Sequence, residues 1–212
     1  MWPLIAIGAL LVALAFVRFW CILPARIRGT LPRKTTPSDS FRTLVVLGSG
    51  GHTTEMLKLI KRLQRSRYTP LAFVVAATDH TSREKAKQER QNPDITFFEI
   101  PRSREVGQSW ITTVFSTAKA FLHCMIIVLR YQPDLLLCNG PGTCIPLCAA
   151  VLLLRFVGLK TDAKIIFCES FARVTHLSLS GKLLYPVVDE FVVHWPQLQA
   201  AYPRSRYLGV LC

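Results

Sequence analysis

The pattern of apolar and charged positions divides the chain into three parts. Residues 1–17 carry no charge, Arg18 interrupts them, and the apolar run then continues to residue 25. About 20 apolar residues suffice to cross a bilayer, and an arginine near the end of a span can extend its side chain toward the lipid head groups. We therefore predict a transmembrane signal anchor at residues 1–25, a basic linker at residues 26–41 and a folded domain at residues 42–212.

The position of the basic residues indicates how this anchor is oriented. A cleaved signal peptide, the alternative, would place them before the apolar run. Here they follow it, as Arg26, Arg28, Arg33 and Lys34. The positive-inside rule then predicts a single-pass protein with a short luminal N-terminus and a cytosolic domain. Removing residues 1–25 is expected to release most of the protein from membranes.

In the folded domain, short apolar runs alternate with segments of helical or polar pattern. Most runs are continuously apolar, as in strands of a parallel sheet that helices cover on both faces. We predict an α/β fold, a Rossmann-like doubly wound parallel sheet, in which ligands bind beyond the carboxyl ends of the strands. The predicted strands are residues 44–47, 71–77, 95–100, 135–138, 164–168, 190–194 and 207–211, and the predicted helices are residues 52–66, 80–90, 108–130, 143–157 and 176–185.

One predicted helix lies within an uncharged stretch, residues 140–154. This stretch is short for a second membrane span and directly follows a strand, so we predict a buried core helix. A helix that also touches the membrane or a partner is the alternative.

The glycine cluster after the first predicted strand is the clearest candidate site. Glycines let the backbone turn sharply and approach a ligand closely, and the free amide groups at a helix start favour an anion. His52, in the same turn, can bind a phosphate or accept a proton near neutral pH. A purely structural turn is the alternative. The predicted phosphate-type site consists of Gly48, Ser49, Gly50, Gly51, His52 and Thr53.

Two further loops at strand ends are predicted to hold an anion. Arg102 and Arg104 follow the third strand, and two guanidinium groups can hold a diphosphate, unless they belong to a solvated surface loop. Asn139, Gly140 and Gly142 follow the fourth strand, in a turn that we predict to be a second wall of the cleft.

Glu169, after the fifth strand, is the second candidate for catalysis beside His52. A carboxylate at this edge of the sheet can act as a base or bind a hydroxyl group. A salt bridge between Glu169 and Arg173 is the alternative.

Composition narrows the classes of ligand. The chain has 26 basic and 13 acidic residues, a net charge of +13, but no DNA- or RNA-binding signature. We therefore expect anionic lipid or a phosphorylated substrate rather than nucleic acid. The seven cysteines lie mostly in apolar runs without CxxC or zinc spacing, which predicts buried thiols in a reducing compartment and no metal site. No motif for a cofactor is present, since the glycine pattern lacks the third glycine and the acidic ribose partner of a dinucleotide site.

The motifs together resemble a known family. Residues 48–55 are similar to the N-terminal glycine loop of lipid-linked GlcNAc transferases of the GT-B type, such as the bacterial enzyme that makes the disaccharide of the peptidoglycan precursor. Further blocks resemble the membrane-anchoring subunit of the eukaryotic two-subunit UDP-N-acetylglucosamine transferase of the dolichol pathway. These blocks are residues 100–106, 138–144, 169–170, 177–182 and 207–209.

This resemblance implies half of an enzyme, inactive alone. A soluble catalytic subunit is expected to supply the UDP-GlcNAc site, and this chain the binding site for dolichyl diphosphate GlcNAc, to which the second GlcNAc is added on the cytosolic face of the endoplasmic reticulum. The family also implies that the C-terminal tail, here Val210, Leu211 and Cys212, docks the partner. A non-enzymatic membrane receptor or scaffold with a degenerate nucleotide-binding fold is the alternative.

Overall fold

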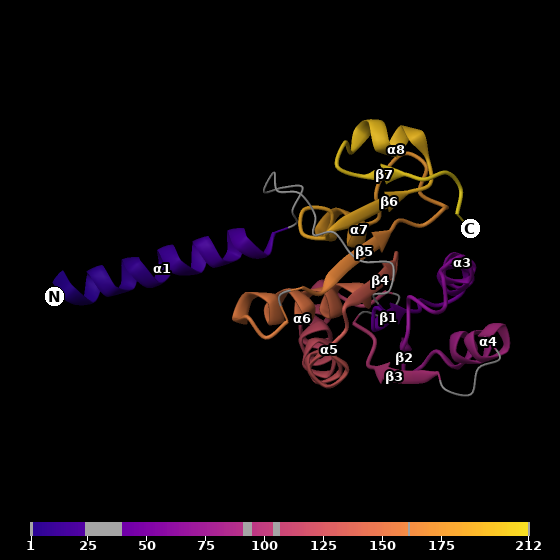
Figure 1. Cartoon of the computed structure of the whole chain (residues 1–212), viewed down its shortest axis with the longest axis horizontal. Helices are drawn as coiled ribbons and strands as arrows, with labels where there is room; N and C mark the ends of the chain where they lie inside the picture. Colours follow the sequence, from indigo (N-terminus) through magenta and orange to yellow (C-terminus); the bar gives the residue numbers. More distant parts are fainter. Residues whose placement is uncertain (1, 24–39, 91–94, 104–106, 161, 212) are drawn as a thin grey trace.

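One parallel sheet of seven strands forms the centre of the folded domain (Figure 1). The computed structural model describes residues 2–23, 40–90, 95–103, 107–160 and 162–211. The strand order is β3-β2-β1-β4-β5-β6-β7, and every neighbouring pair is parallel. The predicted doubly wound parallel sheet is therefore confirmed. The strands are β1 (Thr43–Val46), β2 (Leu71–Ala76), β3 (Thr96–Ile100), β4 (Leu135–Asn139), β5 (Lys164–Cys168), β6 (Glu190–Val193) and β7 (Arg206–Tyr207).

Helices cover both faces of this sheet, which explains why its strands are continuously apolar. On one face, α3 (Gly51–Lys61) and α4 (His80–Arg90) pack through Met56, Ile60 and Ala86 onto the sheet. On the other face the larger core lies beneath α5 (Trp110–Tyr131), α6 (Cys144–Val157), α7 (Leu179–Leu184) and α8 (Pro196–Ala201).

Capping residues set the ends of the two long helices on the second face. Ser109 caps α5 by accepting a hydrogen bond from the backbone of Thr112, and Gln132 ends it in a left-handed conformation before Pro133. Gly158 ends α6 with φ at 87°. Most of α6 is buried, so residues 144–157 form the predicted core helix.

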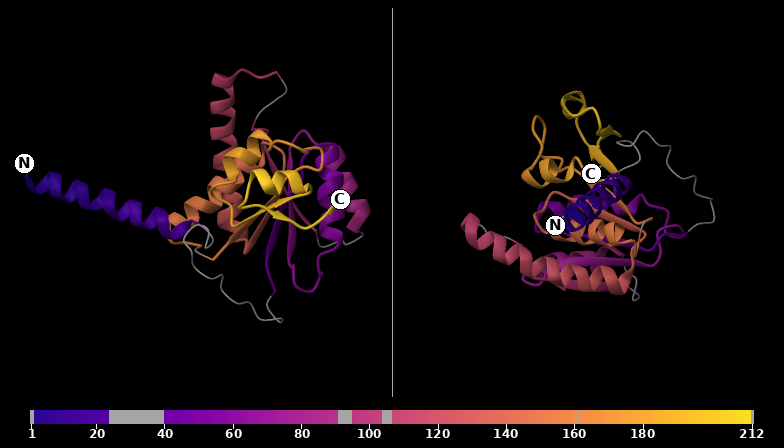
Figure 2. Two further views of the ribbon diagram at one scale, coloured as in Figure 1. Left: turned by 90° about the horizontal axis from the view of Figure 1, so that it is seen from above. Right: turned by 90° about the vertical axis from the view of Figure 1, so that its left-hand side faces the viewer.

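The N-terminal helix α1 (Trp2–Ile22) projects from the domain, and its side chains are largely exposed (Figures 1 and 2). Its segment Ile5–Ile22 is long and apolar enough to cross a membrane. Arg18 joins it to the end of α6, since Nε and Nη2 donate to the carbonyls of Phe156 and Arg155 at 2.7 and 2.8 Å. Residues 24–39, most of the predicted linker, lie outside the described residues.

Two predicted element boundaries were wrong, and one helix was missed. Helix α3 ends at Lys61 instead of residue 66, because the backbone amides of Arg62 and Leu63 bond three residues back and tighten the last turn. Strand β7 ends at Tyr207 instead of residue 211, since Gly209 turns the chain at a φ of 79°. Helix α8 was not predicted, although Pro196 sits in its first turn, where proline is favoured.

The cysteines of the domain behave as predicted. Cys124, Cys138, Cys144, Cys148 and Cys168 are buried free thiols. Burial raises the pKa of Cys124 to about 12 and that of Cys138 well above its usual value. Cys124 and Cys138 therefore stay protonated at neutral pH, and all five side chains fill the core as small apolar groups.

Candidate functional site

The central strands β1 and β4 lie side by side, but the chain leaves them toward opposite faces of the sheet, through α3 and α6. Such a switch in direction opens a crevice at the carboxyl ends of the strands. A cavity of about 890 Å³ lies there, within the usual range for a ligand site. Its wall includes the predicted residues Gly48, Ser49, His52, Arg102, Gly140 and Gly142.

The other predicted residues that the structure describes in these loops are not part of the cavity wall. Asn139 and Thr53 lie directly behind the wall, where they hold its backbone, as described below. Gly50 and Gly51 form the start of α3, and Glu169 is buried beyond it. Arg104 lies outside the described residues.

The glycine loop is held in shape from behind. The carbonyl of Gly48 accepts hydrogen bonds from the hydroxyls of Thr53 and Ser82, the latter at 2.9 Å. Ser82 is fixed in turn by Asp79, whose carboxylate lies 2.7 Å from its hydroxyl and accepts its backbone amide at 3.1 Å. Gly50 then opens α3 at a φ of 64°, a conformation that glycine adopts without strain. Sequence reasoning missed Asp79 and Ser82, because these contacts join residues far apart in the chain.

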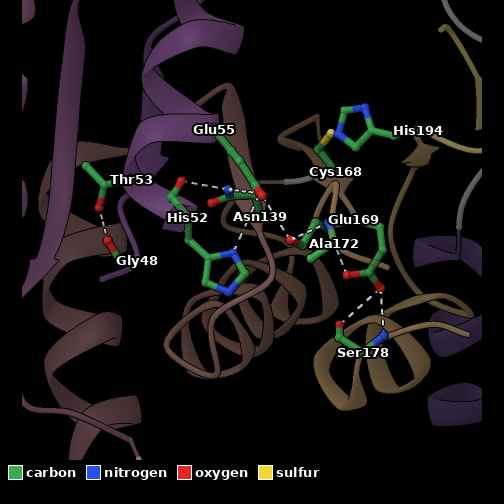
Figure 3. A network of polar contacts seen from close by, with 11 residues as sticks. Gly48, His52, Thr53, Glu55, Asn139, Cys168, Glu169, Ala172, Ser178 and His194 are labelled. Atoms are coloured by element: carbon green, nitrogen blue, oxygen red, sulfur yellow. Dashed lines mark hydrogen bonds and ion pairs between the residues drawn. The ribbon is translucent and has the colours of Figure 1, made fainter. Parts of the chain in front are cut away.

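His52 lies in the first turn of α3 and faces the cavity, with its side chain about one-third exposed (Figure 3). The amide of Asn139 donates to the His52 carbonyl at 2.8 Å. The imidazole fits closely against Gly140, where a β-carbon would lie only 2.3 Å from Cε1. Nδ1 of the same ring is 3.7 Å from Oε2 of Glu55. The loops after β1 and β4 therefore fix both the backbone and the ring of this residue.

Glu55 is held in the same cluster, in the second turn of α3. Its Oε1 accepts a hydrogen bond from the Ser170 hydroxyl at 3.0 Å. Burial alone would raise the pKa of Glu55, but the contacts with His52 and Ser170 outweigh it and hold the pKa below its usual value. The carboxylate is therefore ionised at neutral pH.

Glu169, the other candidate for catalysis, is fully buried. It accepts hydrogen bonds from the Ser170 amide at 2.9 Å, the Ser178 amide at 2.9 Å and the Ser178 hydroxyl at 3.0 Å (Figure 3). These bonds connect the loop after β5 to the start of α7. The alternative of a salt bridge with Arg173 is not seen among the described ion pairs.

The electrostatics of the cavity favour an anion. Arg102 and Arg173 line it from two different loops, and α3 begins at its edge with free backbone amides. Asp79 also lines the cavity, but its carboxylate already bonds to Ser82. A diphosphate matches this combination of guanidinium groups and amide donors.

The opposite rim of the cavity is apolar. Val114 on α5 and Leu179 and Leu183 on α7 line the cavity and are more than half exposed. Along α5 the exposed apolar side chains continue at helical spacing, through Ile111, Phe115, Leu122, Ile126 and Leu129. A second candidate membrane span, Ile111–Tyr131, coincides with this helix.

This helix cannot cross a membrane without dismantling the core, because Cys124, Ile127 and Val128 pack beneath it. It is instead a core helix with a second, outward apolar face. Sequence reasoning missed this face, although the recurrence of apolar residues 111, 115, 122, 126 and 129 on one side of the predicted helix was visible.

The tail leaves the domain beside His194. The backbone amide of Leu211 donates to Nδ1 of this buried histidine at 3.4 Å, and the side chain of Val210 is about half exposed. Burial lowers the pKa of His194, against the opposing effects of Gly209 and of the carboxylates Glu55 and Glu169. Cys212 lies outside the described residues.

Comparison with known proteins places this site in a family. Residues 43–211 match the family described as "Oligosaccharide biosynthesis protein Alg14 like". The mouse protein named "UDP-N-acetylglucosamine transferase subunit ALG14" is 44% identical over 217 residues, which cover 97% of this chain and 96% of the mouse chain.

Solved structures agree on the fold. The MurG crystal structure from Acinetobacter baumannii is 17% identical with a TM-score of 0.54, and the match covers 73% of this chain and 41% of MurG. A putative UDP-N-acetylglucosamine 2-epimerase from Listeria monocytogenes matches with a TM-score of 0.55 at 15% identity, over 77% of this chain and 42% of the epimerase. The chain thus spans about two-fifths of either protein. The same fold occurs in proteins with different names, so it does not by itself identify the family. The sequence match is what identifies the family: this chain belongs to the Alg14-like oligosaccharide biosynthesis proteins.

Proposed function

We propose that this chain is the membrane-bound, acceptor-binding subunit of a UDP-GlcNAc transferase that adds the second GlcNAc to dolichyl diphosphate GlcNAc. The observation that carries this proposal is the cavity at the switch point, which has an anion-binding wall on one side and an exposed apolar rim on the other. A lipid-linked diphosphate has the same two-part chemistry.

The diphosphate is assigned to the polar wall. Gly48, Ser49 and His52 would contact it from the loop after β1, with Gly140 and Gly142 opposite. Gly50, Gly51, Thr53 and Asn139 would shape and support this wall from behind. Arg102 and Arg173 would neutralise its charge. Arg104, in the same loop as Arg102, remains a candidate outside the described residues. His52 is our choice for the base that takes the proton of the acceptor hydroxyl, and Glu169 is reassigned to positioning the loop that carries Ser170.

The lipid chain is assigned to the apolar rim and the membrane. We place α1 across the bilayer of the endoplasmic reticulum, with the N-terminus luminal and the domain cytosolic. Helix α5 runs crosswise to α1, as a comparison of the views in Figure 2 shows. With α1 upright, α5 would then lie along the membrane surface. Its outward apolar face is flanked by exposed Lys119 and Arg130, which suit an interfacial helix on anionic lipid.

The donor site is assigned to a soluble partner subunit. The relatives are named transferase subunits, which supports a division of the enzyme between two chains. We place the docking site on the tail, at Val210, Leu211 and Cys212. On this proposal the chain is inactive alone.

Reconstitution tests the proposal. The assay combines this chain in detergent with the soluble partner, UDP-GlcNAc and a short-chain polyprenyl diphosphate GlcNAc. Transfer of GlcNAc is expected only when both chains are present. Removing a hydrogen bond to a charged group costs about 1.5–3 kcal/mol. Arg102→Ala and Arg173→Ala should therefore each raise the acceptor KM roughly 10- to 100-fold and leave the UDP-GlcNAc KM unchanged.

Arg65→Ala, an exposed arginine outside the cavity wall, is the matched control. If both cavity variants recruit the partner and support wild-type transfer at all acceptor concentrations, the chain is a scaffold and the proposal is wrong.

A further inference from the structure

A buried polar atom of His52 lacks a partner in the cluster behind the cavity. Among the described residues, Nδ1 of His52 has no hydrogen bond, although it is buried from solvent. Leaving such a group unsatisfied costs about 1–3 kcal/mol. An acceptor that could satisfy it is Oε2 of Glu55, 3.7 Å away and one helical turn later. Hydrogen bonds at catalytic groups are often long before substrate binds and shorten in the complex.

Glu55 is held in place to serve as this acceptor. Its side chain is about four-fifths buried. Oε1 accepts from the Ser170 hydroxyl at 3.0 Å, and the Asn139 amide nitrogen lies 3.5 Å from Oε2. Ser170 is in turn fixed, because its backbone amide donates to Glu169. Contacts from β4 and from the loop after β5 therefore restrain the carboxylate beside the ring (Figure 3).

The ring fits into the space that the missing side chain of Gly140 leaves. A β-carbon there would approach Nδ1 to 2.6 Å and Nε2 to 3.1 Å. With the Nδ1 proton directed at Glu55, the lone pair of the ring is on Nε2. A carboxylate that orients a histidine through its second nitrogen in this way fixes the tautomer and stabilises the protonated ring.

From this geometry we infer that Glu55 is a positioning residue, which fixes the Nδ1–H tautomer of His52 and stabilises the charge that the ring gains during transfer. The inference rests on the proposed function. In the reaction, the acceptor hydroxyl oxygen forms a bond to the anomeric carbon of GlcNAc. The bond from that carbon to the distal phosphate oxygen of UDP breaks, and its electron pair leaves with UDP. The hydroxyl proton moves to Nε2 of His52.

The simplest test is Glu55→Gln in the reconstituted complex. We expect kcat to fall roughly 10- to 100-fold, which is no more than the lower end of the roughly 10²–10⁴-fold that general base catalysis contributes, because Glu55→Gln leaves the base itself in place. The KM values of both substrates and the binding of the partner should stay within about twofold. Glu99→Gln removes the same charge from an exposed pair with Arg83 and should have no effect. A Glu55→Gln complex with wild-type kcat overturns the inference but leaves the proposed function standing, whereas absence of transfer in the wild-type complex refutes the proposed function itself.

A double-mutant cycle separates positioning from a merely structural role. If Glu55 acts through His52, then His52→Ala with Glu55→Gln should lose no more activity than His52→Ala alone. If the two losses in activation free energy add, Glu55 acts independently of His52 and the inference is wrong.

The tautomer of His52 can also be determined by NMR, without an activity assay. In the ¹⁵N-histidine-labelled full chain, with His52→Gln to assign the signal, the wild-type His52 should carry its proton on Nδ1. The protonation should shift toward Nε2 in Glu55→Gln. An Nε2–H tautomer in the wild-type protein overturns the inference, even if the Glu55 variant does not fold.

Discussion

Gly140→Ala tests how closely the His52 ring depends on the backbone beside it. The added β-carbon would lie 2.3 Å from Cε1 of the ring, whereas ordinary contact begins at 3.4 Å. The ring must therefore retreat by about 1 Å, a displacement that can cost roughly 100-fold in rate. Gly140 also has a φ of 63°, where a side chain costs about 1–2 kcal/mol.

We expect kcat of the reconstituted complex to fall about 100-fold. The thermal midpoint should fall by roughly 2–8 °C, at about 2–4 °C per kcal/mol for a chain of this size. Steady-state kinetics and thermal melting of the same preparation measure the two effects separately.

Gly142→Ala is the control in the same turn. Its β-carbon would meet only the Ser103 hydroxyl, at an ordinary 3.5 Å, and its φ is not positive. Because Gly142 also lines the cavity, any effect of its methyl group on acceptor binding is expected in KM, whereas kcat should stay within about twofold. Wild-type kcat in Gly140→Ala would refute the placement of His52 in the reaction, and equal losses in both variants would show that the turn, rather than the ring, is being perturbed.

Three further predictions concern the membrane, the partner and pH. Contrary to the expectation from the sequence, a chain lacking residues 1–25 should still float with anionic vesicles, because the outward apolar face of α5 remains. Phe115→Glu with Leu122→Glu in this chain should abolish flotation, and flotation of that variant would exclude the face. Deleting residues 210–212 should weaken capture of the partner at least roughly 100-fold, since two apolar side chains contribute about 3–6 kcal/mol, and leave thermal stability nearly unchanged. The pKa of His194 is lowered from 6.5 in the folded protein. Its contribution to the free energy of unfolding is therefore complete above pH 6.5 and is lost as the pH falls through the folded pKa. Wild-type protein should thus lose more thermal stability between pH 7 and 5 than His194→Gln, and equal losses would contradict this.

The fold was readable from the sequence because its signals are local. Continuous apolar runs that alternate with helical patterns specify a parallel sheet, and Gly48–Gly51 mark the turn after β1. The end of β7 was not readable, since Tyr207–Leu211 is apolar enough for a strand and only the conformation of Gly209 ends it.

The site could be predicted only in part, because only some of its signals are local in the sequence. Residues that follow strand ends could be assigned to one edge of the sheet, and six of them line the cavity. Which carboxylate faces His52 depends on contacts between distant segments, such as Ser170 with Glu55, 115 residues apart. Glu169 met every sequence criterion for a base, yet its oxygens are taken by Ser170 and Ser178.

The proposed membrane geometry depends on the contacts of one arginine. The last carbonyls of a helix have no partner within it, and those of Arg155 and Phe156 at the end of α6 receive the guanidinium of Arg18. This contact satisfies the two carbonyls and places a charge of favourable sign at the negative end of the helix dipole. It also fixes α1 to the face of the domain that carries α5. Because α5 runs crosswise to α1 and its Val114 lines the cavity, a bilayer around α1 would meet the apolar rim of the pocket directly (Figure 2). The acceptor could then present its diphosphate to the glycine loop while its lipid chain stays in the membrane.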